Sequence, residues 1–551
     1  MDDKQLALLG DEAVALGAIH AGISAAYGYP GTPSTEILEY LINEHERGGF
    51  AARWCSNEKT ALEAALGVSF AGRRSLVTMK HVGLNVAADP FINAALLGIK
   101  GALVIAVADD PGMHSSQKEQ DSRFYAAFAM VPCLEPRGQQ EAYDMTREAF
   151  AISEKFQVPV LLRLSTRLSH ARAAINTRSA EGQKPVSKTD ERERWMLLPA
   201  FARKNYAALI EKQKDIQAWS LKHPANKLEL SAGADLAVIT AGLGGNYYEE
   251  NLADLTAACS GKAPARLHIG AYPLPAEAIQ TLCGASEKIL IIEEGQPFIE
   301  EKLRGILPQS AAIAGKLAGF NGETSPVVRT GELDPDNVRA ALGLPPRLAV
   351  AVSGLPAAIP PRPPQLCQGC PHADSYDTVK KAVAEIDGQP GHPDVGINSD
   401  IGCYSLGAAP PYQVPESIVC MGASVGMAKG AADAGLKYSI AIIGDSTFIH
   451  SGITGLIDAA AANTPMTLII LDNSIVAMTG CQPTMIPSEK LRPLLLGCGV
   501  DPAHLLELEA KKQLIDENAA RLKTEIEYCG LSVVVFKREC LEALRKNRKN
   551  Q

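Results

Sequence analysis

The chain has 551 residues, of which 46% are hydrophobic and 21% are charged, a composition that is typical of globular proteins and excludes disordered and fibrous classes. This length predicts several domains, because a single hydrophobic core rarely grows beyond roughly 250–300 residues. Acidic residues outnumber basic ones by 62 to 53, and the net charge of −9 disfavours nucleic-acid binding.

The N-terminus does not look like a targeting segment. Asp2 and Asp3 stand where a secretory signal carries basic residues, and no apolar run reaches the ~18 residues that a membrane span needs. We therefore expect a cytoplasmic protein. In that compartment the twelve cysteines are expected to be thiols, core residues or metal ligands, not disulfides.

Apolar runs of strand length alternate with alanine-rich stretches of helical period, which predicts α/β domains with mainly parallel sheets. We expect a first domain over residues 1–170 and a polar linker with some helix over residues 171–232. The strands predicted for the first domain are Ser75–Met79, Leu103–Ala108 and Val158–Leu164.

Two further domains are expected. Strands at Leu236–Thr240 and Ile289–Glu293 indicate a second domain over residues 233–354, and the proline-rich segment 355–365 breaks any helix and marks a boundary. The third domain covers residues 366–551. Its predicted strands are Ser417–Met421, Tyr438–Ile443, Met466–Leu471 and Leu531–Phe536, and apolar residues from Phe448 to Ile457 have helical spacing.

Two polar turns follow neighbouring strands of the third domain, at Gly444-Asp445-Ser446 and at Asp472-Asn473. The carboxyl ends of parallel strands meet at one sheet edge, where ligands collect. The Asp445 carboxylate, the Asn473 amide oxygen and a backbone carbonyl, expected to be that of Ile475, are hard oxygen ligands that suit Mg²⁺ holding a diphosphate. The spacing alone is equally well explained by two helix-capping turns.

The Gly-Asp and Asn spacing resembles the thiamine diphosphate fingerprint. Longer motifs, collinear from about residue 8 to 540, resemble the alpha subunit of indolepyruvate ferredoxin oxidoreductase. These motifs are Tyr29-Pro-Gly-Thr-Pro-Ser34, Met79-Lys-His-Val-Gly-Leu-Asn85, Ala108-Asp-Asp-Pro-Gly-Met-His-Ser-Ser-Gln117, Cys367-Gln-Gly-Cys-Pro-His372, Asp400-Ile-Gly-Cys-Tyr404, Gly444-Asp-Ser-Thr-Phe-Ile-His-Ser-Gly452 and Met478-Thr-Gly-Cys-Gln482.

The resemblance implies three successive domains: a pyrimidine-binding, a transketolase C-terminal-like and a diphosphate-binding domain. It implies oxidative decarboxylation of an aryl 2-oxoacid on thiamine diphosphate and Mg²⁺, with acyl transfer to coenzyme A and electron transfer through iron–sulfur clusters to ferredoxin or another acceptor. It also implies a smaller beta subunit as partner and a dimer of this chain within a hetero-oligomer.

The candidate catalytic residues lie in the first domain. Glu58 matches the family's activating glutamate, and Ser56 is expected to cap a helix that has Glu58 in its first turn. A carboxylate is needed there because proton transfer at the cofactor's aminopyrimidine activates the thiazolium carbon. Thr32 is expected to hydrogen-bond the substrate's carboxylate or oxyanion, and His81 is the third candidate. Five more polar residues either take part in catalysis or hold loops; they are Asn85, Asp109, Asp110, His114 and Gln117.

The third domain is expected to bind the cofactor and a cluster. Residues matched to cofactor binding are Gly402, Cys403, Gly444, Asp445, Ser446, Asn473, Ile475 and Thr479. Cys367, Cys370 and Cys403 resemble ligands of a four-iron cluster, and Cys540 is the first candidate for the fourth ligand. Less favoured alternatives for that ligand are Cys420, Cys481 and Cys498. The alternative is that all of these are ordinary turn and core cysteines without a metal.

One departure from the family concerns electron transfer. Members usually carry a C-terminal ferredoxin-like domain with two four-cysteine runs, and this sequence contains no Cys-x2-Cys-x2-Cys run. Either the clusters lie on the partner subunit, or electrons leave by another acceptor, or the chemistry is not oxidative. The alternative functions are therefore a non-oxidative thiamine-dependent decarboxylase or carboligase and a non-catalytic scaffold subunit.

Overall fold

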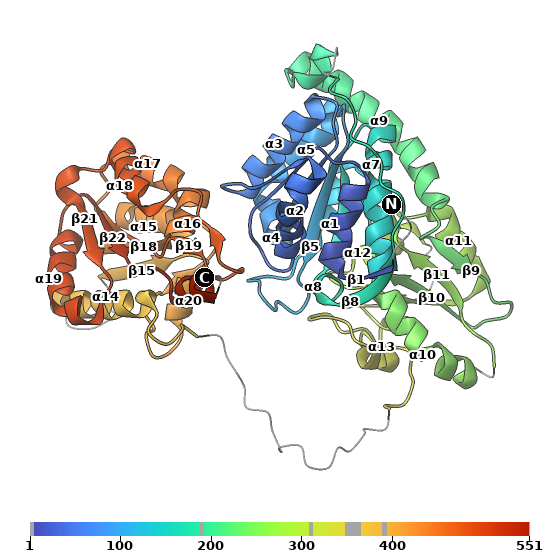
Figure 1. The fold of residues 1–551 in the computed structure, drawn as a ribbon. Helices are drawn as coiled ribbons and strands as arrows, with labels where there is room; N and C mark the ends of the chain where they lie inside the picture. The colour runs from blue at the N-terminus through green and yellow to red at the C-terminus, as the bar shows by residue number, and fades with distance from the viewer. Residues whose placement is uncertain are drawn as a thin grey trace. The chain divides into compact units, whose positions relative to one another are not determined.

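The computed structural model describes residues 5–187, 191–259, 261–307, 312–347, 365–387 and 394–549. The chain divides into two compact units, Met1–Ala351 (unit 1) and Val352–Gln551 (unit 2), and Figure 1 shows the elements of each. The proline-rich segment predicted at 355–365 lies outside the described residues except for residue 365. None of the described helices has the length and apolar character needed to cross a membrane.

The larger sheet of unit 1 has seven strands in the order β12-β6-β7-β5-β4-β2-β3. All neighbouring strands pair in parallel except the edge strand β12, which is antiparallel to β6. The strands are β2 (Ala25–Gly28), β3 (Ala51–Trp54), β4 (Ser75–Lys80), β5 (Leu103–Asp109), β6 (Cys133–Leu134), β7 (Val160–Ser165) and β12 (Ala271–Tyr272). Strands β5 and β7 are buried along their whole length, as expected for continuous apolar runs in a parallel sheet.

The three strands predicted for this region are confirmed as β4, β5 and β7, with ends that differ by one or two residues. Helices pack on the sheet and on one another, with α1 against α7 and α2, and α5 against α3 and α9. They are α1 (Gly10–His20), α2 (Thr35–Gly48), α3 (Glu58–Phe70), α4 (His81–Val86), α5 (Ala88–Leu97), α6 (Arg123–Ala129), α7 (Gln139–Phe156) and α8 (Thr166–His170).

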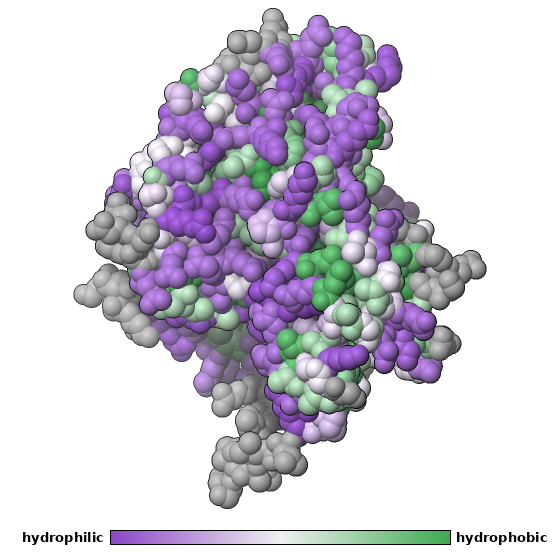
Figure 2. All heavy atoms as spheres, turned by 90° about the vertical axis from the view of Figure 1, so that its right-hand side faces the viewer, coloured by the Kyte–Doolittle hydropathy of each residue, from purple (hydrophilic) through white to green (hydrophobic). Residues whose placement is uncertain are grey.

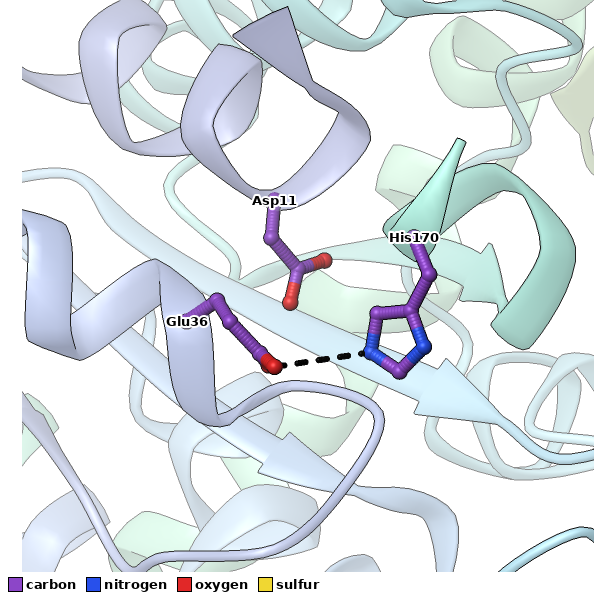
Figure 3. A group of neighbouring side chains, drawn as sticks. All are labelled: Asp11, Glu36 and His170. Carbon is purple, nitrogen blue, oxygen red and sulfur yellow. Dashed lines mark ion pairs between the residues drawn. The ribbon is translucent and has the colours of Figure 1, made fainter. Parts of the chain in front are cut away.

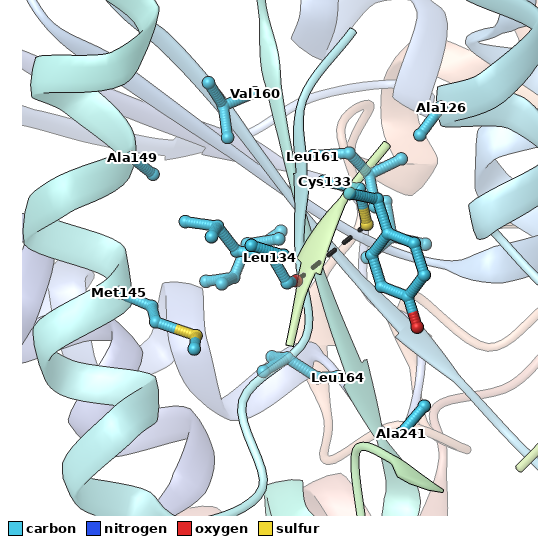
Figure 4. Close-up of a cluster of buried hydrophobic side chains, with 14 of the residues drawn as sticks. Ala126, Cys133, Leu134, Met145, Ala149, Val160, Leu161, Leu164 and Ala241 are labelled. Carbon is cyan, nitrogen blue, oxygen red and sulfur yellow. Dashed lines mark hydrogen bonds between the residues drawn. The ribbon is translucent and has the colours of Figure 1, made fainter. Parts of the chain in front are cut away.

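Close packing of apolar side chains joins α7 to the sheet. In Figure 4, Met145 and Ala149 of α7 face Leu134, Val160 and Leu164 from β6 and β7, and all five side chains are nearly or fully buried. This cluster belongs to one continuous hydrophobic core that runs through unit 1. Removing such area from water contributes about 25 cal/mol per Å².

The segment 171–232 contains regular structure. Strand β8 (Arg172–Asn176) pairs antiparallel with β1 (Gln5–Leu9), a short helical turn η1 covers Arg192–Trp195, and the 23-residue α9 (Pro199–Leu221) follows. The helix expected in this segment is therefore present.

The face shown in Figure 2 is mostly hydrophilic, with hydrophobic residues in small scattered groups.

A second sheet of unit 1 has the order β14-β13-β10-β11-β9, in which only β9 is antiparallel to its neighbour. The predicted strands Leu236–Thr240 and Ile289–Glu293 correspond to β10 and β13. The elements are β9 (Lys227–Glu229), β10 (Leu236–Ala241), α10 (Gly244–Ala258), β11 (Ala265–Ile269), α11 (Ala276–Ala285), β13 (Lys288–Ile292), α12 (Phe298–Ile306), β14 (Ala312–Ala314), η2 (Phe320–Gly322) and α13 (Pro335–Ala341).

Unit 2 is built on a six-stranded, all-parallel sheet with the order β16-β15-β17-β18-β22-β21. Its strands are β15 (Val395–Ser399), β16 (Ser417–Ile418), β17 (Tyr438–Gly444), β18 (Met466–Asp472), β21 (Leu505–Glu509) and β22 (Leu531–Lys537). Strands β17, β18 and β22 confirm the prediction. Strand β16 is shorter than the expected Ser417–Met421 because the chain turns into α15 at Gly422, whose φ is +85°.

The helices and smaller elements of unit 2 connect these strands. They are α14 (Pro371–Asp387), η3 (Cys403–Ala408), α15 (Ala423–Asp433), α16 (Asp445–Thr447), η4 (Phe448–Gly452), α17 (Ile453–Ala461), β19 (Ile475–Val476), β20 (Gln482–Pro483), η5 (Ser488–Lys490), α18 (Leu491–Gly497), η6 (Pro502–His504), η7 (Lys512–Leu514), α19 (Ile515–Ile526) and α20 (Leu541–Lys549). The helical stretch predicted from Phe448 begins with a π-helical turn, η4, a feature that is rare and frequent at functional sites.

Candidate active site

Glu58 begins α3, close behind the carboxyl end of β3. The cap of this helix is Asn57, whose side chain accepts a hydrogen bond from the Thr60 backbone N–H at 2.8 Å. The prediction of Ser56 as the cap is wrong, because Asn57 is the extended residue whose side chain reaches the third helical position. The Ser56 hydroxyl instead donates to Thr60 Oγ1 at 3.3 Å. Glu58 is only 5% exposed.

Helix α4 provides the space for the Glu58 side chain. A Cβ atom added at Gly83 would lie 2.5 Å from Glu58 Oε1, so any larger residue at position 83 would displace the carboxyl group. The sequence pattern that ends β4 and opens α4 therefore sets the position of Glu58.

Thr32 is half-buried in the loop between β2 and α2. The loop backbone is held by three hydrogen bonds: Gly31 N–H donates to Thr35 Oγ1 at 3.0 Å, the Ser34 hydroxyl to Gly31 O at 2.8 Å, and the Ser115 hydroxyl to Thr32 O at 3.0 Å. None of these bonds uses the Thr32 hydroxyl, and the loop that carries it is anchored on both sides.

Lys80, the last residue of β4, lies beside this loop. Its Nζ donates to Ser115 O at 2.8 Å, and its stem passes Gly31, where an added Cβ would be 3.4 Å from Lys80 Cδ. Burial lowers the pKa of Lys80 to about 8, although the Asp110 and Glu58 carboxylates oppose that shift. The sequence contains Lys80 within a quoted motif, but only the structure places this amine near Glu58 and the Thr32 loop.

His81 opens α4 and is 1% exposed. Its Nε2 donates to Lys118 O at 2.8 Å, so the ring holds the loop that follows β5. Asn85 binds Gln120 at 2.8 Å and accepts from the Tyr125 hydroxyl at 2.6 Å. These contacts suit a loop-holding role, and a catalytic role of His81 stays a prediction.

The two aspartates at the end of β5 have different partners. Asp109 accepts from Arg163 Nε at 2.7 Å. Asp110 accepts from the Ser116 and Thr166 hydroxyls at 2.6 and 2.7 Å; burial acts to raise its pKa, but these hydrogen bonds hold the pKa below its usual range. His114 is exposed and lies 3.3 Å from Glu332, and Gln117 is exposed.

In unit 2, the two polar turns meet at the carboxyl edge of the sheet, as predicted. Strands β17 and β18 pair in parallel, and the Ser474 N–H bridges the turns by donating to Asp445 Oδ2 at 2.8 Å and to Asp472 Oδ1 at 3.1 Å. Asn473 Oδ1 accepts from the Ile475 N–H at 3.2 Å. Asp445 and Asn473, the candidate ligands of a divalent cation, therefore stand on adjacent loops.

The electrostatics of this edge favour a cation. Asp445 is 9% exposed and Asp472 is 3% exposed. Burial raises the pKa of Asp445 well above its ordinary value, and the Asp472 carboxylate raises it further. Two buried carboxylates that face each other repel unless one is protonated or a positive charge lies between them. The donor set of carboxylates, an amide and a carbonyl therefore fits Mg²⁺ and the diphosphate that it holds.

The ring of Tyr404 explains why two of the candidate cofactor residues, Gly402 and Gly444, are glycines. A Cβ atom at Gly402 or Gly444 would lie 2.4 or 2.5 Å from Tyr404 Cε1, so both positions need glycine to accommodate this ring. Thr479 is tied to Gln482, with its hydroxyl donating to Gln482 Oε1 at 2.6 Å. Ser446 donates its N–H to Asp445 Oδ1 at 2.8 Å and so orients that carboxylate.

The four candidate cluster cysteines gather near the same edge. The Cys367–Cys370 turn precedes α14, and Arg538 ties it to the end of β22 by donating to Gly369 O at 2.7 Å. The Cys540 N–H donates to Asn473 O at 3.3 Å. Burial, and then the nearby thiols of Cys370 and Cys540, raise the pKa of Cys403 to about 12.

These thiols do not converge on one point. Among the described residues, no three of the four sulfur atoms lie within 4.8 Å of one another. A single metal ion needs closer ligands, whereas the thiolates of a four-iron cluster bind separate irons. Of the alternative fourth ligands, Cys481 is close enough to affect Cys403 electrostatically, and Cys420 is exposed.

Comparison with known proteins finds a thiamine diphosphate-binding family match in each of the two units. Residues 16–231 match the family model "Pyruvate flavodoxin/ferredoxin oxidoreductase, thiamine diP-bdg". Residues 400–503 match "Thiamine pyrophosphate enzyme, C-terminal TPP binding domain". Glu58 lies in the first match and Asp445 in the second.

The relatives that match along nearly the whole of this chain share one name. The chain is 36% identical to the indolepyruvate oxidoreductase subunit IorA of Archaeoglobus fulgidus, over 98% of this chain and 87% of that protein. It is 35% identical to the IorA subunit of Methanothermobacter marburgensis, with the same coverage of each chain.

A solved structure has the same fold. It is a chain of the 2-oxoglutarate:ferredoxin oxidoreductase from Magnetococcus marinus, with a TM-score of 0.50 and 17% identity over 61% of this chain and 65% of that chain. The resemblance seen in the sequence motifs is confirmed by these matches. The chain therefore belongs to the family of indolepyruvate oxidoreductase IorA subunits, which are subunits of thiamine diphosphate-dependent 2-oxoacid oxidoreductases.

Proposed function

We propose that this chain is the thiamine diphosphate-binding subunit of a cytoplasmic enzyme that oxidatively decarboxylates an aryl 2-oxoacid of the indolepyruvate or phenylpyruvate type. The acyl group passes to coenzyme A, and the electrons pass to an iron–sulfur acceptor. A smaller beta subunit completes the enzyme, within which this chain forms a dimer. In this proposal residues 1–170 bind the pyrimidine, 233–354 form the transketolase C-terminal-like domain and 366–551 bind the diphosphate.

One observation carries the proposal most directly. Asp445 and Asp472 are buried together at the edge of a parallel sheet, and Asn473 stands between them and β19. Such crowding of carboxylates is costly unless a cation neutralises it. Mg²⁺ held by Asp445, Asn473 and the Ile475 carbonyl supplies that charge and the link to the diphosphate.

When bound, thiamine diphosphate supplies a nucleophilic carbon and an electron sink for loss of CO₂. In unit 1, the Glu58 carboxyl would hold the proton exchanged with the cofactor's aminopyrimidine. The Thr32 hydroxyl and the Lys80 ammonium, both beside the loop between β2 and α2, would bind the carboxylate of the 2-oxoacid. Burial of Glu58 limits proton exchange with water.

The cysteine group supports an oxidative reaction. Cys367, Cys370, Cys403 and Cys540 would hold one four-iron cluster, and their crowding in a partly buried site is relieved when metal binding keeps them deprotonated. A cluster near the Asp445 loop is placed to accept electrons from the substrate-derived carbanion. Aryl acids as substrates rest on the names of the relatives.

The test is an anaerobic preparation of this chain with its beta subunit, analysed for thiamine diphosphate, magnesium and iron. We expect roughly four irons per chain of this subunit and reduction of a viologen dye that needs both coenzyme A and an aryl 2-oxoacid, with slower turnover of pyruvate and 2-oxoglutarate. Release of CO₂ and aldehyde by an iron-free preparation, without coenzyme A or dye, would establish the non-oxidative alternative. If a cofactor-loaded complex shows neither activity, the chain is a non-catalytic scaffold subunit.

Asp445→Ala tests the cofactor site separately. We expect calorimetry to show that the Mg²⁺-dependent affinity for thiamine diphosphate falls at least about 10-fold, because an anionic ligand of the cation is lost. The variant should remain folded, since one of two repelling carboxylates is removed. Asp433→Ala, at an exposed carboxylate that pairs with Lys429 on α15, is the matched control. Unchanged affinity in Asp445→Ala would contradict the assignment.

A further inference from the structure

Three ionisable side chains from three helices converge in unit 1, outside the candidate active site (Figure 3). Asp11 stands in the first turn of α1, Glu36 in the first turn of α2, and His170 ends α8. One ligand atom of each lies within 4.8 Å of the other two, and Glu36 Oε1 is 3.7 Å from His170 Nε2. In the part of the chain that the structure describes, no other group of three His, Cys, Asp or Glu side chains converges as closely.

Asp11 lacks the partners that a buried carboxylate needs. It is 0% exposed, and neither of its oxygens accepts a hydrogen bond from a described residue. Figure 3 shows its carboxylate pointing into the space between Glu36 and His170. The neighbouring Ser169 hydroxyl also makes no hydrogen bond of ordinary geometry to a described residue, but it is close enough to the Asp11 carboxyl to oppose the rise in its pKa. Leaving such groups unsatisfied costs about 1–3 kcal/mol for each one, and more if it is charged.

The buried carboxylate of Asp11 does not cap α1, because the Glu12 side chain fills that role. Glu12 Oε2 accepts from the Leu9 N–H at 2.8 Å, and the same carboxylate lies 3.3 Å from Arg172. Arg172 is therefore already paired with Glu12.

With all three side chains ionised the group would carry one net negative charge. Burial raises the pKa of Asp11 well above its ordinary value; the Ser169 hydroxyl and His170 oppose that shift, and Glu36 adds to it. The contact with His170 lowers the pKa of Glu36, and the contact with Glu36 raises that of His170. A cation between the three side chains would let Asp11 ionise despite its burial.

We propose that Asp11, Glu36 and His170 bind a divalent transition-metal ion, for which Zn²⁺ is the best match. One imidazole nitrogen and two carboxylate oxygens suit Zn²⁺, whereas Mg²⁺ and Ca²⁺ prefer oxygen ligands alone. At bond lengths of about 2.1 Å, two ligand atoms of a tetrahedral ion are ~3.4 Å apart. Glu36 and His170, at 3.7 Å, already approach this separation, and the limit of 4.8 Å for the whole group requires the other ligand atoms to close by up to roughly 1.4 Å.

The exposure of the group allows an ion to enter. The side chains of Glu36 and His170 are 37% and 36% exposed, while Asp11 forms the buried base. Water fills the fourth position of a tetrahedral ion, as in zinc sites with three protein ligands.

An ion here would act on the candidate active site through two helices. The first residue of α2, Thr35, binds the backbone of the Thr32 loop at Gly31, and the first residue of α8, Thr166, donates to Asp110 Oδ1 at 2.7 Å. Helix α1 lies so close to α8 that a Cβ at Gly10 would be 2.2 Å from Leu168 O. The ion would tie the starts of α1 and α2 to the end of α8 and stiffen the base of these loops.

The experiment uses the full chain, stripped of metal with a chelator and then titrated with ZnCl₂. Wild type is compared with Asp11→Asn and His170→Gln, and Glu44→Gln is the control, because Glu44 lies further along α2 and pairs with Arg47 at 3.2 Å. We expect wild type and Glu44→Gln to bind about one equivalent more than the two site variants. The affinity of this site should fall by more than the roughly 10- to 100-fold that loss of an outer-shell partner costs.

Two readouts separate this site from the cysteines of unit 2, since thiols are also ligands of Zn²⁺. Co²⁺ in a histidine–carboxylate site lacks thiolate-to-metal charge-transfer absorption, and the extra equivalent should lack it. Zn²⁺ should also raise the thermal midpoint of unit 1 in wild type and not in the site variants. Equal stoichiometry and equal thermal shifts in wild type and both site variants would overturn the proposal. If Asp11→Asn does not fold, the partly exposed His170→Gln decides by itself.

Discussion

Unit 1 buries ionisable side chains in two contrasting ways. In the network around Arg123 and Arg163, carboxylates meet guanidinium groups: Arg123 lies 2.5 Å from Asp121 and 3.0 Å from Glu293, and Arg163 lies 2.7 Å from Asp109. At the other site, Asp11 is equally buried, and neither of its oxygens makes a hydrogen bond of ordinary geometry to a described residue. Both sites contain more acidic than basic groups, but guanidinium groups pair with the carboxylates of the first, where Asp109 Oδ1 is left without a partner, whereas no arginine or lysine pairs with Asp11 among the described residues.

The difference shows how to separate a structural cluster from a ligand site. The Arg123 network joins the larger sheet to the segment after β13, since Arg123 also donates to the Glu294 and Gln296 carbonyls at 3.0 and 3.1 Å. Its positive charges come from the protein. A carboxylate that is buried to the same degree, but without a guanidinium or ammonium partner, points instead to a cation that binds from solution.

The largest expected effect comes from breaking the satisfied network. Arg123→Met leaves Asp121 and Glu293 buried without their main counter-ion, and we expect the free energy of unfolding of unit 1 to fall by about 3–5 kcal/mol. Tryptophan fluorescence during urea unfolding measures this effect, because Trp54, Trp195 and Trp219 all lie in unit 1.

The control for Arg123→Met is Arg47→Met, at an exposed pair with Glu44. We expect a change of about 0.5 kcal/mol or less there. Wild-type stability of Arg123→Met would mean that the buried carboxylates find other relief, and the distinction between the two kinds of cluster would fail.

Glu58 is a third buried carboxylate, and the role proposed for it is to exchange a proton, not to bind an arginine or a metal ion. Glu58→Gln keeps the size of the side chain, so we expect cofactor binding to persist while turnover of the complete enzyme falls at least ~10²-fold, or about 2.7 kcal/mol, as for general acid–base groups. Glu63→Gln, at an exposed residue of the same helix that pairs with Lys59, should keep its turnover. Wild-type turnover of Glu58→Gln would refute the role given to Glu58.

His268 gives a smaller effect that depends on pH. Its Nδ1 lies 2.9 Å from the Thr240 hydroxyl, and its Nε2 has no hydrogen-bond partner among the described residues. Burial, with the positive charges of Arg137 and Arg266, lowers its pKa to about 3. The folded state therefore keeps His268 neutral, whereas the unfolded chain takes up a proton below about pH 6.5.

Above about pH 6.5, His268 is neutral in both states and does not affect the free energy of unfolding. As the pH falls from about 6.5 towards 3, only the unfolded chain binds the proton, so the free energy of unfolding decreases, by about 2 kcal/mol at pH 5. We expect His268→Gln to remove that much of the difference in urea stability of unit 1 between pH 7 and pH 5, again followed by tryptophan fluorescence. A variant with the wild-type pH dependence would show that another group titrates.

The parts of the fold that sequence reasoning found depend on local pattern. Strands β5, β17, β18 and β22 were predictable because each is a run of apolar residues buried on both faces. Strand β8 was not, because its exposed, polar pattern has meaning only when β1, more than 160 residues earlier, lies beside it. The cap of α3 at Asn57 in place of Ser56 depends on the backbone angles of two adjacent residues that are both good caps.

By itself, the sequence determined the class of fold and the chemical groups at the ends of the strands, because hydrophobic period and short polar motifs are local properties of the chain. Only the tertiary structure decided which of those groups stand alone and which are paired. Asp11, Glu36 and His170 are far apart in the sequence and meet only because α1, α2 and α8 pack together. Whether a buried charge is satisfied depends on such long-range contacts, and no local pattern encodes them.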